Sequence, residues 1–315
     1  MFLSKIMRTA VFAVAASLFA FSVTSCEKDA ATPTIAAVVI DGANFTLLEK
    51  ALIKADLVAT FQGAGTFTVF APTDDAFKAA GIDEAFIAAN TKETLAAVLK
   101  THVLSTKVLS TAIVTGDNTS TATLNGNVFI TKNTAGVSVN GAKVTSADVA
   151  ASNGVVHVID RVLFPTALDV VATAQASSIH TLLVAAIVKA GLVTTLQGAG
   201  PFTVFAPNNT AFEALGAPYN TVANIQGMNA TQTAALKDIL LYHVVAARVF
   251  STNLKAGTVG TALATKSVTV NLDSGVKVTG GTAANVANVV TSPVARFNIS
   301  ATNGVIHTID KVLVP

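Results

Sequence analysis

Cysteine, tryptophan and tyrosine are scarce or absent in this chain. Its 315 residues include one cysteine, no tryptophan and two tyrosines. A single cysteine cannot form an internal disulfide, which excludes a disulfide-stapled scaffold. Charged residues make up only 12% of the chain, whereas 51% of the residues are hydrophobic. We therefore expect domains that are held together mainly by burial of apolar side chains.

The N-terminal segment, residues 1–25, has the pattern of a secretory signal peptide. Two basic residues precede an apolar run, 10–23, and a small residue follows that run. This order is typical of a leader that is cleaved during export. Residues 23–26, Val-Thr-Ser-Cys, resemble a bacterial lipobox. The resemblance implies cleavage before Cys26 and attachment of lipid to that residue; an ordinary signal peptide with an accidental cysteine is the alternative.

A short polar segment, 26–33, follows the predicted cleavage site and is suited to be a tether. Its residues 27–29, Glu-Lys-Asp, are similar to the acidic tag that sends some Gram-negative lipoproteins to the cell surface. Outside the leader, no apolar run reaches the roughly 18 residues that a membrane span needs. Together these two resemblances imply a protein that is anchored to the outer membrane, at the cell surface, through lipid on Cys26.

Strong charge of either sign is also missing after the leader. Without Lys5 and Arg8, the 20 basic residues fall to 18, which equals the number of acidic residues. No basic stretch stands out, and nucleic acid is therefore a poor candidate partner.

One stretch of thirteen residues occurs twice. Residues 153–165 read NGVVHVIDRVLFP and residues 303–315 read NGVIHTIDKVLVP, with nine identical positions. An Asn-Gly pair predicts a turn, and the apolar run that follows predicts a strand covered on both faces. Each copy ends at a proline, which cannot donate to a sheet. The repeat predicts two domains, 34–165 and 166–315.

The order of expected elements is similar in the two repeats. Helical spacing of apolar residues predicts a helix over 45–60, matched by 179–194. A strand over 66–71 is expected to end at a helix that is capped by Thr73 or Asp74, with Asn208 or Asn209 in the second repeat. A helix over 92–104, matched by 231–245, precedes short strands at 127–131, 136–140 and 142–145. Because helices come mostly before strands, the fold class is α+β.

Three motifs, each present twice in the same order, resemble the fasciclin (FAS1) domain. They are TVFAPTDDAF at 68–77 and TVFAPNNTAF at 203–212, Thr101-His102 and Tyr242-His243, and the repeated strands. The resemblance covers nearly all of the chain after the leader. It implies two tandem domains, each a wedge-shaped β-sandwich with helices packed on one side. It also implies an extracellular adhesion or matrix-binding module.

The recurring histidines point to structure rather than to catalysis. In a regular strand, His157 and Asp160 lie on opposite faces, as do His307 and Asp310, so neither pair can form a dyad. We expect His102, His157 and His307 to be structural, together with Asn153 and Asn303 of the turns. A metal site needs three or four converging ligands, which the recurring residues do not supply, and no cofactor is expected.

Two segments are candidates for ligand binding. In animal fasciclin domains, an Asp-Ile pair before the Asn-Gly strand is tied to receptor binding, and Asp148-Val149 lies at that place here. The second repeat has Asn298-Ile299 and therefore lacks the carboxylate. The Tyr-His segment of the family is likewise linked to receptors, and Tyr242-His243 matches it. Maintenance of the fold is the competing interpretation of all these residues.

The leading hypothesis is a non-enzymatic binding protein. No Gly-x-Ser-x-Gly element is present, and the carboxylate pair Asp74-Asp75 becomes Asn209-Thr210 in the second repeat. The expected partner is an extracellular or cell-surface protein or a polysaccharide. Two alternatives stay open: a hydrolase that uses His102 or His243 with a nearby hydroxyl, and a structural spacer of the cell envelope.

Overall fold

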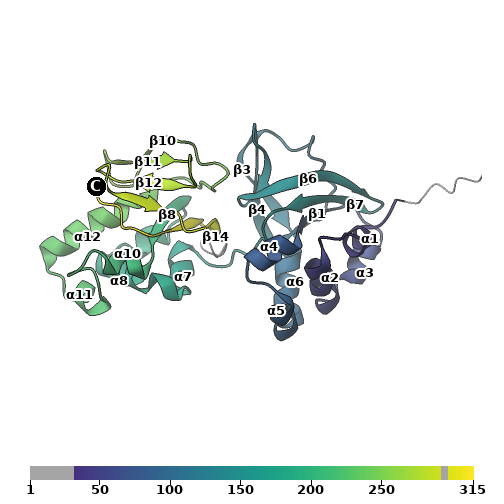
Figure 1. The fold of residues 1–315 in the computed structure, drawn as a ribbon, viewed down its shortest axis with the longest axis horizontal. Helices are drawn as coiled ribbons and strands as arrows, with labels where there is room; N and C mark the ends of the chain where they lie inside the picture. Colours follow the sequence, from purple (N-terminus) through teal and green to yellow (C-terminus); the bar gives the residue numbers. More distant parts are fainter. Residues whose placement is uncertain (1–31, 292–296) are drawn as a thin grey trace, which may run out of the picture. The chain divides into compact units, whose positions relative to one another are not determined.

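The first domain of the computed structural model begins with helices and ends with a buried strand (Figure 1). The structure describes residues 32–291 and 297–315, so the predicted leader, Cys26 and most of the predicted tether lie outside the described residues. The helices of this domain are α1 (Ile35–Ile40), α2 (Thr46–Lys54), α3 (Val58–Gln62), α4 (Asp74–Ala79), α5 (Glu84–Ala89) and α6 (Lys92–Thr101). The strands are β1 (Phe67–Pro72), β2 (Val103–Leu104), β3 (Gly116–Thr123), β4 (Gly126–Asn133), β5 (Gly136–Val139), β6 (Ala142–Ala151) and β7 (Gly154–Ile159).

Seven strands of the first domain form one sheet in the order β2-β1-β7-β6-β5-β4-β3. Strands β1 and β7 pair in parallel, and the other neighbours pair antiparallel. Phe70 and Ile159 of the central strands share a buried cluster with Val128, Ile130 and Val139, which come from β4 and β5. The sheet therefore folds over on itself as a sandwich, in agreement with the predicted fold.

Helices cover the other face of the central strands. Val69 and Val156, which alternate with the residues of the sandwich interior, belong to a separate cluster with side chains of α1, α2 and α6. Figure 1 shows these helices on one side of the strands. The expectation that the repeated strand is covered on both faces is thereby confirmed.

The second domain repeats this plan with smaller sheets. Its helices are α7 (Val170–Gln175), α8 (Thr181–Lys189), α9 (Val193–Leu196), α10 (Asn209–Glu213), α11 (Val222–Gln226) and α12 (Ala230–Tyr242), with a 3₁₀ turn at Ser178–His180. One sheet has the order β14-β15-β8-β9 and the other β10-β11-β12-β13. The strands are β8 (Phe202–Pro207), β9 (Val244–Val245), β10 (Gly257–Gly260), β11 (Ser267–Asn271), β12 (Lys277–Thr279), β13 (Val286–Asn288), β14 (Ile299–Ala301) and β15 (Gly304–Ile309).

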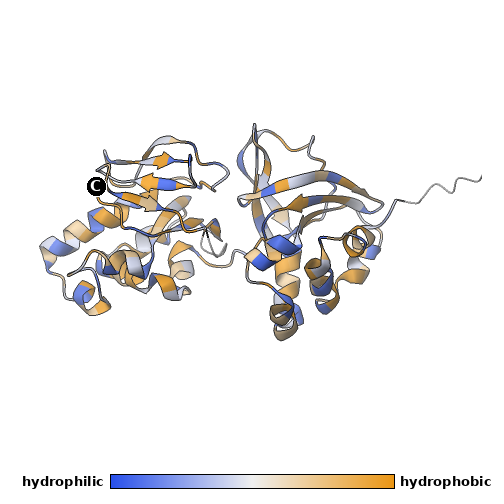
Figure 2. Ribbon diagram, in the orientation of Figure 1, coloured by the Kyte–Doolittle hydropathy of each residue, from blue (hydrophilic) through white to orange (hydrophobic). Residues whose placement is uncertain are grey.

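The two sheets of the second domain face each other across an apolar cluster. Phe205 and Ile309 from one sheet pack with Val268, Val278 and Ala287 from the other. In both domains, hydrophobic and hydrophilic residues alternate over short stretches of the ribbon (Figure 2). Among the described residues, no helix is long and apolar enough to cross a membrane.

Both members of each candidate pair, Thr73-Asp74 and Asn208-Asn209, cap a helix. Thr73 caps α4 and Asn208 caps α10, as one member of each pair was expected to do. The neighbouring side chains cap a different helix: Asp74 accepts from the Leu47 N–H of α2 at 2.8 Å, and Asn209 accepts from the Leu182 N–H of α8 at 3.1 Å. In each domain, two adjacent residues after the strand thus cap the N-termini of two different helices.

Some expected elements differ from those observed. The helix expected over 45–60 is observed as two helices, α2 and α3. Between them Asp56 has a φ of 58°, which is incompatible with a continuous right-handed helix. The helix expected over 179–194 divides in the same way around Gly191, whose φ is 67°. Strand β3 was not expected at all, since its polar sequence GDNTSTAT carries no apolar alternation.

Candidate functional site

The asparagine of each Asn-Gly pair connects three parts of its domain. Asn153 Oδ1 accepts a hydrogen bond from the backbone N–H of Ile35 at 2.9 Å, and Nδ2 donates to the carbonyls of Phe61 and Gly63, both at 2.8 Å. The side chain is buried, so these partners replace water completely. The Asn-Gly pair predicts only a turn at this residue, whereas the side chain holds α1 and the end of α3 against the start of β7.

Asn303 repeats every one of these contacts in the second domain. Its Oδ1 accepts from the Val170 N–H at 3.0 Å, and Nδ2 donates to the carbonyls of Leu196 and Gly198, both at 2.8 Å. The recurrence of the motif at fixed places in both repeats was the available signal. Its long-range partners were not visible in the sequence, because they lie more than 100 residues away along the chain.

The histidine of each repeated strand is buried and bonded to backbone. Nε2 of His157 lies 2.9 Å from the Val108 carbonyl, and Nδ1 accepts from the Asp148 N–H at 3.1 Å. His307 makes the equivalent contacts to Val249 O at 2.8 Å and Asn298 N at 3.4 Å. Since Nδ1 accepts, the hydrogen is on Nε2 in both rings. Both ring nitrogens are therefore used within the fold.

Asp148 and Asn298 occupy matching positions with left-handed backbone conformation. Their φ values are 59° and 53°, and Asp and Asn tolerate this region better than other non-glycine residues. The Asp148 carboxylate accepts from both the N–H and the hydroxyl of Ser110. These hydrogen bonds from Ser110 lower the pKa of Asp148. The Asn298 side chain bonds to the equivalent serine, Ser251. Its Oδ1 accepts from the Ser251 backbone N–H, and its Nδ2 donates to the Ser251 hydroxyl, both at 2.7 Å.

This geometry bears on the predicted ligand-binding pair Asp148-Val149. Asp148 is exposed and Val149 is partly buried against the helical core of the first domain. The carboxylate is reachable from solvent, although both of its oxygens already hold Ser110 in place. A ligand role for this pair stays a prediction.

The second predicted ligand-binding segment, Tyr242-His243, lies inside the second domain. The Tyr242 side chain is 1% exposed, and its hydroxyl donates to the Ser267 carbonyl at 2.7 Å. Nδ1 of His243 donates to the Ile239 carbonyl at 2.7 Å, and Nε2 accepts from the Leu313 N–H at 2.9 Å. Direct contact between a partner and either side chain would require the domain to open.

His102 makes the same contacts in the first domain. Nδ1 donates to the Val98 carbonyl and Nε2 accepts from the Leu163 N–H, both at 2.8 Å. The hydrogen is thus on Nδ1, the opposite tautomer from His157. Burial lowers the pKa of His102 to about 4, and it lowers the pKa of His243 and of His307 to about 4 as well. All three rings are neutral at pH 7.

The hydrolase alternative needs a solvent-open histidine beside a hydroxyl in a cleft. His102 and His243 are buried and bond only to backbone. His180, which sequence analysis did not single out, has Nδ1 3.0 Å from the Ser177 hydroxyl and Nε2 3.2 Å from the Thr308 hydroxyl. It too is buried, at the base of α8. Within residues 32–291 and 297–315, no three His, Cys, Asp or Glu side chains converge as a metal site would require.

The two domains contact each other through polar and aromatic side chains. Arg248 of the second domain donates to the carbonyls of Ala301, Thr302 and Gly304, and its guanidinium carbon lies 4.0 Å from the ring centroid of Phe129 in the first domain. Burial lowers the pKa of Arg248 to about 10, so the guanidinium stays charged at neutral pH. A cation above an aromatic face is favourable, and more so when it is desolvated.

Asn253 extends this domain contact with two further hydrogen bonds. Its Nδ2 donates to Asp117 Oδ1 and to Thr131 Oγ1, both at 2.9 Å. Thr252 beside it bonds through its hydroxyl to the Ser138 hydroxyl, also at 2.9 Å. Side chains of β3, β4 and β5 thus meet the segment 248–253, and we call this set of contacts the domain seam.

The comparisons with known proteins assign the family. The Fasciclin domain profile matches residues 43–165 and 178–315, within the two predicted domains. The chain therefore belongs to the fasciclin family and contains two tandem fasciclin domains.

Transforming growth factor-beta-induced protein ig-h3 of Sus scrofa is 30% identical over 258 residues, which cover 81% of this chain and 35% of that protein. Protein sll1483 of Synechocystis is 42% identical over 135 residues, covering 42% of this chain and 73% of that protein. A solved FAS1 domain pair of the insect cell adhesion molecule Fasciclin I is 18% identical, with a TM-score of 0.42, over 85% of this chain and 96% of that one. The chain spans about a third of the length of the first relative.

Proposed function

We propose that this protein is a lipid-anchored adhesion or binding protein of the cell surface. Its fasciclin domains would recognise an extracellular or cell-surface protein or a polysaccharide, and Cys26 would carry the lipid. Membership of the fasciclin family supports binding as the general function, because adhesion is what the resemblance of the motifs implies.

One observation carries the proposal. The chemically versatile residues of the motifs are engaged with their own domain: His102, His157, His243 and His307 bond to backbone groups and are buried. Because these rings are buried and bonded to backbone, a partner would contact other residues, on the outer surface of the domains. This supports a binding protein over the hydrolase alternative. The alternative of a structural spacer predicts that the protein binds no ligand, and a binding experiment distinguishes it from the proposed function.

A binding experiment tests the proposal and the predicted contact at Asp148. The full-length chain would be screened against glycans and extracellular matrix proteins, and then compared with the variant Asp148→Asn. The second domain shows that asparagine at this place keeps the left-handed backbone and the serine contacts. The variant therefore removes the charge alone.

We expect a ligand of wild-type protein to bind Asp148→Asn at least about tenfold more weakly if the carboxylate touches it. Asp273→Asn, at an exposed turn of the second domain, is the matched control. A ligand that binds all three proteins equally would place recognition elsewhere on the surface. Failure of every ligand to bind would favour the spacer.

The anchor is tested separately on intact cells. Protease added outside should degrade both domains, and Cys26→Ala should release the protein from the membrane fraction. Protection of the domains in cells whose outer membrane is intact would contradict the surface location.

A further inference from the structure

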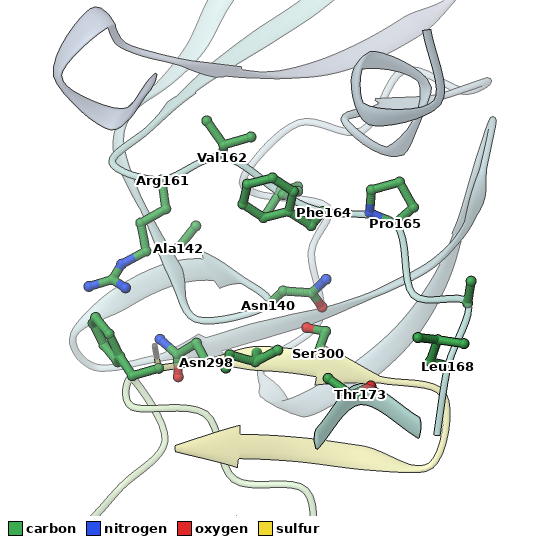
Figure 3. A pocket seen from close by; sticks show the side chains of 14 residues that line it. Asn140, Ala142, Arg161, Val162, Phe164, Pro165, Leu168, Thr173, Asn298 and Ser300 are labelled. Atoms are coloured by element: carbon green, nitrogen blue, oxygen red, sulfur yellow. The ribbon is translucent and has the colours of Figure 1, made fainter. Parts of the chain in front are cut away.

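A cavity of about 360 Å³ lies where the two domains and their connecting segment meet (Figure 3). Its walls come from the turn between β5 and β6, from the connecting segment after β7, from α7 and from the start of β14. The lining residues of these parts are Asn140, Ala142, 161–165, Ala167, Leu168, Thr173 and 297–300. Cavities of this size are typical of small-molecule sites, which are mostly apolar with a few placed polar groups. Two of its lining residues, Leu163 and Asn298, also donate backbone N–H groups to His102 and His307.

The first unusual feature of this cavity is Arg161. The guanidinium carbon lies 3.7 Å from the ring centroid of Phe297, and Nη1 is buried without a hydrogen-bond partner among the described residues. The nearest carboxylate oxygen, Asp160 Oδ1, is 3.9 Å from Nε and already accepts from the Lys143 N–H at 2.7 Å. A buried donor without an acceptor is costly, and burial lowers the pKa of Arg161. The arginine thus has hydrogen-bonding capacity that residues 32–291 and 297–315 do not use.

The internal repeat shows that this arrangement is not required by the fold. Lys311 occupies the position of Arg161 in the second copy of the strand. It is exposed, and its Nζ donates to the Ala284 carbonyl at 3.1 Å. At this position of the motif, the Lys311 ammonium of the second domain has a hydrogen-bond acceptor. Nη1 of Arg161, beside the cavity, has none in the part of the chain that the structure describes.

The second unusual feature is the apolar end of the cavity. Phe164 and Leu168 line it and remain 43% and 44% exposed, which is high for large hydrophobic side chains. In Figure 3, Arg161 and Asn298 lie at one end, and Leu168 and Thr173 lie at the other. The cavity therefore offers a cationic end and an apolar end, a pattern complementary to an amphipathic anion.

We propose that this cavity binds a small organic carboxylate with an apolar body. The carboxylate accepts hydrogen bonds from the Arg161 guanidinium, whose planar donors match carboxylate geometry. The body of the ligand covers Phe164 and Leu168 and removes their apolar surface from water. This site is independent of any surface that recognises a matrix or polysaccharide partner.

The test is calorimetric titration of the full-length chain with 4-phenylbutanoate and with its neutral counterpart, 4-phenylbutan-1-ol. We expect one saturable site for the acid. Arg161→Gln should weaken binding of the acid at least about tenfold, because it removes charge-assisted hydrogen bonds to the carboxylate, and should leave binding of the alcohol unchanged. Lys311→Gln, the matched substitution in the second copy, should affect neither ligand.

A second pair of variants keeps the test decisive if Arg161→Gln does not fold. Leu168→Asp alters a half-exposed side chain and places a negative charge at the apolar end, so it should weaken the acid and the alcohol. Val188→Asp, at an exposed apolar residue of α8, is its control and should weaken neither. The proposal is overturned if neither ligand saturates a site, or if Arg161→Gln binds the acid as tightly as the wild type.

Discussion

The backbone N–H of Leu163 donates to Nε2 of His102 at 2.8 Å, deep inside the first domain. Leu313 and His243 repeat this contact at 2.9 Å in the second domain. Each contact ties the segment after the last strand to the end of a helix. It requires a neutral ring, because a proton on Nε2 would face a backbone N–H that has no other acceptor.

Stability should therefore fall as the solution is acidified. His102, His243 and His307 have pKa values of about 4 in the folded protein, lowered mainly by burial, against 6.5 for the unperturbed residue. Between pH 6.5 and 4 the unfolded chain binds protons that the folded protein does not. Stability is complete above pH 6.5 and is lost towards pH 4, by about 3 kcal/mol for each ring. Urea unfolding at pH 7 and pH 4.5 measures the loss.

The variant His243→Gln serves as the control for this prediction. It should be less stable than the wild type at pH 7 and should show a shallower pH dependence, because one of the three titrating rings is gone. A free energy of unfolding that is equal at pH 7 and pH 4.5 would contradict neutral burial of these rings.

Replacing Asn153 by alanine should destabilise the first domain by about 2–4 kcal/mol. The substitution leaves the N–H of Ile35 and the carbonyls of Phe61 and Gly63 without their buried partner. Asn303→Ala should do the same to the second domain. Asn127→Ala, at an exposed position of β4, is the control and should change stability by less than about 0.5 kcal/mol. Equal unfolding midpoints for Asn153→Ala and the control would refute a structural role for this side chain.

Gly154 should not tolerate a side chain. A Cβ at this position would lie 2.1 Å from the Phe67 carbonyl oxygen, where β1 and β7 run side by side in parallel. Gly154→Ala should therefore lower stability by about 2–3 kcal/mol, measured by thermal unfolding. Gly260→Ala, at a strand position where a Cβ would meet no atom within 4 Å, should be nearly neutral. A Gly154→Ala protein as stable as Gly260→Ala would argue against close approach of the strands.

The domain seam should weaken when Asn253 becomes aspartate. The substitution replaces a donor to Asp117 Oδ1 by a second carboxylate, so attraction becomes repulsion. We expect the coupling between the domains to fall by about 1 kcal/mol, since the site is partly solvated. Scanning calorimetry should then resolve the two domains as more separate transitions. Asn224→Asp, whose amide bonds only to Asn220, is the control; identical traces for both variants would show that Asn253 does not couple the domains.

Much of the fold was predictable because the repeats state the same pattern twice. The buried strands β7 and β15, the preceding strands β1 and β8, and the caps at Thr73 and Asn208 follow from local residue choice. Strand β3 did not, because it is held by pairing with β4 rather than by its own polar sequence.

The site was less predictable than the fold. The sequence marked Asn153 and the histidines as recurrent, but their hydrogen-bond partners lie in distant segments. The cavity beside Arg161 illustrates the same limit: the sequence shows a conservative exchange with Lys311, and the environments of the two side chains differ completely.

The sequence by itself determined the duplication, the family and the apolar character of the two domains, because periodicity and turn chemistry act over a few residues. Only the tertiary structure decided which polar side chains face inward. Burial and hydrogen bonding of Tyr242, His243 and Arg161 depend on chain segments brought together by folding, and on how much water those segments exclude.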